Sequence, residues 1–212
     1  MPFSEFKNIN MVLEKYPLRI KREKFLPDTI QELPDWFIEN LNFVLEKKQI
    51  DESEFFHCEA LIYPFLQEAW KRHKKLQLWS HQSIYYSDEL SGEPDYLISY
   101  IPDEVIRNII NKPLLAVVEA KKENFTEGWG QCLAELIACQ YMNDDENITI
   151  YGIVTSGELW QFGKLKGNVF TEHMLPASID NPQKIMGILD YILGECEKQI
   201  EVGLQKSQEP VA

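Results

Sequence analysis

Two stretches decide the fold of this chain: Gly-Glu-Pro-Asp-Tyr-Leu-Ile at 92–98 and Leu-Leu-Ala-Val-Val-Glu-Ala-Lys-Lys at 114–122. Asp95 opens the first apolar segment, and Glu119 and Lys121 close the second. Successive side chains of a strand point to opposite faces, so Glu119 and Lys121 share a face. Two carboxylates and an amine at neighbouring strand ends can hold a divalent cation and a water beside a phosphate, which is the chemistry of a metal-dependent nuclease.

The segment 114–120 is almost continuously apolar, which predicts a central strand covered on both faces. Turn residues at Ser156-Gly157 and Lys166-Gly167 predict two hairpins near the C-terminus. Further strands are expected at 78–86, 95–101, 148–155, 159–165 and 169–173.

Helical patterns precede and follow these strands. Asp51 is the expected N-cap of one helix, with Glu54 completing a capping box and Pro64 kinking the helix before it ends near His73. Other helices are expected at 35–48, 131–142 and 181–205. The alternation predicts an α/β fold with one mixed sheet flanked by helices. We expect a single domain: an N-terminal helical extension at 1–50, a core at 51–165, and a strand with a closing helix at 166–205.

Composition narrows the class of protein. The 212 residues are 44% hydrophobic, and no apolar run approaches the roughly 20 residues of a membrane span. The N-terminus lacks an apolar signal segment, so we expect a soluble, cytoplasmic protein with no membrane partner. The four cysteines and four histidines form no zinc pattern, and buried reduced thiols are the simplest interpretation.

The net charge of −13 argues against nucleic-acid binding, because neutralising phosphates normally requires a basic face. Lysines and arginines nevertheless gather at 21–24 and at 71–75. Such runs are either local basic patches or ordinary solvated faces.

The element order, with Pro94-Asp95 and Glu119-Ala120-Lys121 at strand ends, resembles the PD-(D/E)XK nuclease superfamily, whose fold is restriction endonuclease-like. Glu54 followed by Leu-Ile-Tyr-Pro-Phe-Leu at 61–66 is similar to the nuclease domain of type I restriction subunits. Gln131 falls where that group carries a helix glutamine, whereas Glu135 replaces its usual tyrosine. The resemblance covers roughly 52–165 and is closest to uncharacterised bacterial members.

The resemblance implies a role for each matched residue. Asp95, Glu119 and the carbonyl of Ala120 would bind Mg²⁺ or Mn²⁺, with Glu54 turned toward the metal. Lys121 would orient the attacking water or stabilise the phosphate, and Gln131 would steady the substrate or the lysine. The expected activity is hydrolysis of DNA by a magnesium-dependent endonuclease, and a homodimer is a common assembly of such folds.

Other interpretations of these residues remain open. Asp95 can simply cap a turn, Glu119 and Lys121 can be an ordinary ion pair, and the capping box can account for Glu54. Glu59 is the alternative to Glu54 at the metal. The histidines are expected at the surface or in packing, although His81 can also face the cleft. A catalytically silent nucleic-acid-binding or assembly module, or a structural protein, is the alternative function.

Overall fold

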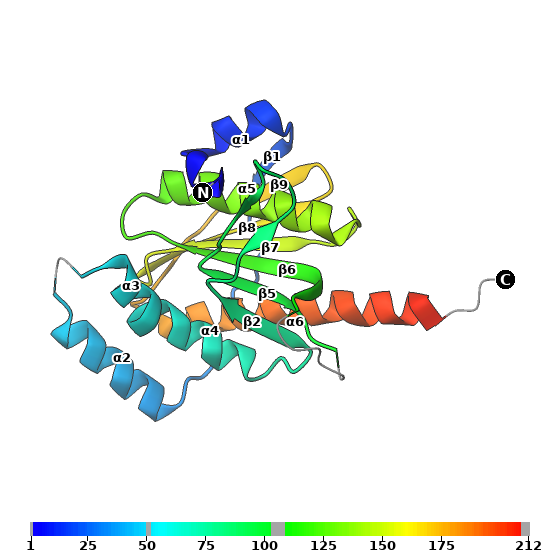
Figure 1. Ribbon diagram of the computed structural model, residues 1–212. Coiled ribbons are helices and arrows are strands. Elements are labelled where there is room, and N and C mark those ends of the chain that lie inside the picture. Colours follow the sequence, from blue (N-terminus) through cyan, green and yellow to red (C-terminus); the bar gives the residue numbers. More distant parts are fainter. Residues whose placement is uncertain (1, 50–51, 103–108, 209–212) are drawn as a thin grey trace.

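The computed structural model describes residues 2–49, 52–102 and 109–208, and a mixed sheet runs through its centre (Figure 1). Within these residues the sheet has eight strands in the order β1-β9-β8-β7-β6-β5-β2, with β10 paired to β8. The bounds of these strands are β1 Arg19–Glu23, β2 Leu76–Ser80, β5 Tyr96–Tyr100, β6 Asn111–Ala120, β7 Ile150–Thr155, β8 Leu159–Lys166, β9 Val169–His173 and β10 Ala177–Ser178. A separate short ribbon pairs β3 (Ile84–Tyr85) with β4 (Ser91–Gly92).

Helices cover both faces of the sheet (Figure 1). Their bounds are η1 Pro2–Glu5, α1 Ile9–Lys15, α2 Asp35–Lys47, α3 Glu54–His57, the π-helix η2 Cys58–Ile62, α4 Tyr63–Trp70, α5 Phe125–Asn143 and α6 Pro182–Gln208. The predicted α/β architecture is confirmed: a mixed central sheet lies between helical layers, and a helix closes the chain. No helix of the described residues is long and apolar enough to cross a membrane.

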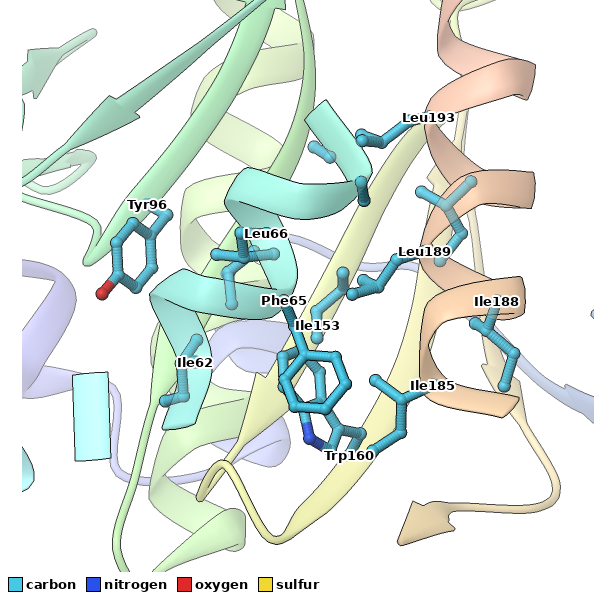
Figure 2. Close-up of a cluster of buried hydrophobic side chains, with 14 of the residues drawn as sticks. Ile62, Phe65, Leu66, Tyr96, Ile153, Trp160, Ile185, Ile188, Leu189 and Leu193 are labelled. Carbon is cyan, nitrogen blue, oxygen red and sulfur yellow. The ribbon is translucent and has the colours of Figure 1, made fainter. Parts of the chain in front are cut away.

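The face under α4 and α6 is packed with apolar side chains. Figure 2 shows Phe65 and Leu66 of α4 and Leu189 of α6 gathered around Ile153 and Trp160 of the sheet. The opposite face lies under α5, with α1 and η1 packed beyond it. Because β6 is buried between the two layers, the prediction of a central strand covered on both faces is confirmed.

The predicted break at Pro64 takes the form of a π-helix. The N–H of Tyr63 donates to the carbonyl of Cys58, five residues back, and Pro64 then occupies the first turn of α4. Proline is tolerated there because the N–H groups of a first helical turn have no partner within the helix. The wide turn thus separates the short α3, which carries Glu54, from α4.

Three local predictions were wrong. The expected strand at 78–86 is divided into β2 and β3, because His81 adopts a φ of +50° between them. Helix α5 begins at Phe125 rather than 131, since Asn124 caps it by accepting the N–H of Glu127. The segment 1–50, expected to be helical, also contributes β1, which pairs in parallel with β9.

Packing explains the early start of α5. Gly128 and Gly130 precede the expected helix start at 131, yet both lie within α5 and face close neighbours from other segments. A Cβ on Gly130 would lie 2.3 Å from the Phe6 carbonyl oxygen. Glycine is therefore required by the approach of the N-terminal segment, and tertiary contact outweighs its low helix propensity.

Candidate functional site

The antiparallel pair of β5 and β6 brings Asp95 opposite Glu119. Tyr96 pairs with Val118, so Asp95, one residue before β5, reaches the end of β6. Its Oδ2 accepts the N–H of Ala120 at 2.7 Å. Within the described residues the Asp95 side chain thus bonds the neighbouring strand and no N–H of its own turn, so the contact supports its position beside Glu119 and not the turn-capping interpretation.

Lys121 lies between two carboxylates. Its Nζ is 3.0 Å from Glu119 Oε1 and 3.8 Å from Glu54 Oε1. The backbone N–H of Lys121 donates to the carbonyl of Thr155, which continues the pairing of β6 with β7 by one residue. As the strand period predicted, Glu119 and Lys121 share a face.

Gly128 of α5 makes room for that lysine. A Cβ at Gly128 would lie 2.9 Å from Lys121 Cγ and 2.6 Å from Val154 Cγ1. The absence of a side chain at this position lets the start of α5 approach the aliphatic part of Lys121. Glycine here is thus a feature of the site, and not of a loop.

Glu54 reaches the site from the first turn of α3. The predicted capping box is wrong, because Ser53 caps the helix by accepting the N–H of Phe56; the expected cap, Asp51, lies outside the described residues. Glu54 is consequently the first helical residue, and its Oε2 accepts the N–H of Lys122 at 3.4 Å. Glu59 is exposed and has no hydrogen bond or ion pair with these residues in the described structure. Of the two candidate glutamates on this helix, Glu54 is therefore the one beside Lys121.

His81 is a member of this group that the sequence only weakly indicated. Its Nε2 lies 3.5 Å from Asp95 Oδ1, and its N–H donates to the Asp95 carbonyl. The signal is the pairing of β2 with β5, in which Ser80 opposes Tyr96 and the next residue out opposes Asp95. The other histidines pack elsewhere, each held by a hydrogen bond.

Gln131 and Glu135 lie on α5 and are both buried. They are three and seven residues after Gly128, so all three share one face of the helix. Gln131 makes no hydrogen bond with Lys121 or with the carboxylates in the described structure, so no contact supports its predicted role. Glu135, the departure from the family pattern, is 1% exposed.

The site is rich in carboxyl groups, and burial makes these groups reluctant to ionise. Burial, followed by the charge of Asp95, raises the pKa of Glu119 to about 8. Burial likewise raises the pKa of Asp95, despite the N–H of Ala120 and the charge of Lys121. Burial disfavours the Lys121 ammonium, but the charges of Glu119 and Glu54 outweigh it and raise its pKa. The single ammonium of Lys121 could therefore not balance these carboxyl groups if all of them were ionised.

The donor set fits a hard divalent cation only in part. Two carboxylates and a backbone carbonyl are oxygen ligands of the kind that Mg²⁺ takes together with several waters. As the side chains stand, however, no group of three or more His, Cys, Asp or Glu residues in the described part of the chain is arranged to hold a metal. Waters and substrate oxygens would have to complete the coordination.

An open depression of about 440 Å³ adjoins the site. It is lined by Glu54, Lys121, Lys122, Glu123, Asn124 and Glu127. A separate cavity of about 500 Å³ lies at the other end of the sheet, between α6 and the start of β7. Glu54 and Lys121 of the site line the first and not the second, so the depression is the candidate substrate site.

No protein-family model matches this chain, and no curated protein sequence matches it. The resemblance to PD-(D/E)XK nucleases therefore stays a prediction that depends on the residues of this chain alone.

Proposed function

We propose that this protein is a divalent-metal-dependent DNA endonuclease that hydrolyses phosphodiester bonds. The observation that carries the proposal is the meeting of Asp95, Glu119 and Lys121 at adjacent strand ends, beside an open depression. Ionising a buried set with more carboxyl groups than ammonium groups is costly unless a cation balances the charge. Mg²⁺ or Mn²⁺ would be that cation, held by Asp95, Glu119 and the Ala120 carbonyl.

In such a site the cation supplies charge stabilisation and an activated water. The chain's own contribution begins with Asp95, whose bond to the Ala120 amide holds the two strand ends together. Lys121 and Lys122 border the depression and offer positive charge to a phosphate oxygen. Glu54 orients Lys121 from the opposite side. Lys121 is the group we expect to contact the reacting phosphate or its attacking water.

Binding of DNA requires basic side chains that are free to contact its phosphates. The basic run at 71–75 is largely neutralised, because Lys71, Arg72 and Lys75 pair with Glu68, Asp190 and Glu201. The run at 21–24 differs, since its cations form no ion pair within the described residues and lie on or beside the exposed edge strand β1. It offers a second contact for a phosphate backbone, although lysines on an edge strand also prevent aggregation.

A catalytically silent assembly module is the second candidate. The ion pair between Lys121 and Glu119 favours it, because this pair occupies both groups in the absence of a cation. Plasmid cleavage and calorimetric Mn²⁺ binding separate the two. We expect Lys121→Ala to bind Mn²⁺ like the wild type while cleavage falls by about 100-fold or more.

Asp95→Asn is the matched variant, since it keeps the shape of the side chain and loses the charge. We expect its Mn²⁺ affinity to fall at least about tenfold, together with cleavage. A wild type that binds no Mn²⁺ at millimolar concentration would refute the nuclease proposal and favour the silent module. Cleavage by Lys121→Ala at the wild-type rate would remove the lysine from the mechanism.

A further inference from the structure

Glu135 is a buried carboxyl group without a hydrogen bond. Its Oε2 is inaccessible to solvent and has no partner within the described residues. Two other side chains, His73 and Gln140, also have such an atom, but each is held by a hydrogen bond from another atom. Glu135 has no hydrogen bond from either oxygen in the described structure, so its local packing offers no explanation for a carboxyl group.

The charges around Glu135 belong to the candidate site. Burial, then the charge of Glu119 and that of Asp95, raises the pKa of Glu135 well above its usual range, and Lys121 opposes the shift. Glu135 also shares its helix face with Gly128, which meets the stem of Lys121. The Glu135 side chain therefore lies on the face of α5 that is turned toward the end of β6, within range of the charges of Glu119 and Asp95.

The number of charged groups around Glu135 offers a reason for its position. Asp95, Glu119 and Glu135 are three largely buried carboxyl groups that share the single ammonium of Lys121. If all three were ionised, the set would lack two positive charges, which is the charge that a divalent cation supplies. An apolar residue at 135 would pack as well in α5, where the neighbouring buried side chains are mostly apolar, and it would avoid the cost of a lone buried carboxyl.

We propose that Glu135 is a positioning residue of the cation site, which strengthens cation binding through the negative charge that its carboxyl group can take up once a cation is bound. The inference rests on the proposed function, because it assigns Glu135 to the same cation. It makes Glu135 no direct ligand, in keeping with the absence of a three-residue metal cluster among the described residues. Residues that act behind metal ligands typically change metal affinity by about 10–100-fold when they are replaced.

The test is Mn²⁺ binding by calorimetry to the full chain and to Glu135→Gln. Glutamine keeps the volume of the side chain and removes its ability to carry a negative charge, so a merely structural role would survive the change. We expect an affinity about tenfold lower or weaker still. Glu68→Gln is the matched control, since Glu68 is also a buried helix glutamate but pairs with Lys71 away from the site; its Mn²⁺ affinity should equal that of the wild type.

Two outcomes would overturn the inference, and they are distinguishable. Equal Mn²⁺ affinity of Glu135→Gln and the wild type would reject the role of Glu135 while leaving the nuclease proposal intact. Absence of Mn²⁺ binding by the wild type would reject both. If Glu135→Gln fails to fold, as judged by circular dichroism, Glu135→Ala replaces it, because alanine is too small to clash in α5 and the same affinity loss is expected.

Discussion

Both faces of the sheet carry an apolar cluster, but they differ in the polar side chains that are buried with it. The face under α6 buries an apolar stripe of that helix: Ile185, Ile188, Leu189, Ile192 and Leu193. The face under α5 buries Glu119 of the sheet together with Gln131 and Glu135 of the helix. Burying carboxyl groups lowers stability unless they are paired. The contrast teaches that one face is organised for stability, whereas the other gives up stability at a site that we assign to cation binding.

The largest expected effect lies on the apolar face. Phe65 is fully buried between the rings of Phe37 and Trp160, at centroid distances of 4.9 and 5.7 Å. We expect Phe65→Ala to lower the free energy of unfolding by about 3–5 kcal/mol, through lost burial and a new cavity. Urea denaturation measures it. Phe43→Ala, at an exposed position of α2, is the control and should change stability by less than about 0.5 kcal/mol.

The next effect distinguishes the α5 face by its pH dependence. The pKa of Glu119 in the folded protein is about 8, above its usual 4.5, so the folded state binds a proton that the unfolded state has released. Stability without metal should therefore be highest below about pH 4.5 and fall steadily as pH rises to about 8. Denaturation in a chelating buffer at several pH values measures this fall.

Glu119→Gln isolates the contribution of that carboxyl group. The variant should be more stable than the wild type near pH 8 and should lose most of the difference near pH 5, where the wild-type carboxyl is protonated in the fold. A pH dependence that is the same in both proteins would show that Glu119 ionises normally, and the contrast between the two faces would then lose its electrostatic basis.

The smallest effect compares one substitution on the two helices. Gly128→Ala in α5 should lower stability by about 1 kcal/mol net, because the new Cβ meets Val154 and Lys121 within 3 Å and the overpacking exceeds the gain in helix propensity. Gly194→Ala in α6 should instead raise it by about 0.5–1 kcal/mol, since the nearest atom would be His73 Cε1 at 3.7 Å. Thermal unfolding of both variants gives the comparison. A stabilised Gly128→Ala would mean that Lys121 has room to move.

Much of the candidate site could be predicted because it depends on the two-residue alternation of side chains along a strand. Glu119 and Lys121 are two residues apart at the end of an apolar strand, which is sufficient to place them on one face. Asp95 opposite Glu119 required only that consecutive strands pair. The capping of α3 was not predictable to the residue, because Asp51 and Ser53 are both good caps and the choice depends on where the helix packs.

The sequence by itself determined the alternation of helices and strands, the central apolar strand and the amphipathic stripe of α6, because periods of 2 and 3.6 residues follow from local backbone geometry. Only the tertiary structure decided that His81 reaches Asp95, that β1 pairs with β9 and that Glu135 is buried among the carboxyl groups. These features join segments far apart in the chain. Neither their pairing nor the burial of a helix face is encoded in any local period, since both depend on which surfaces pack together.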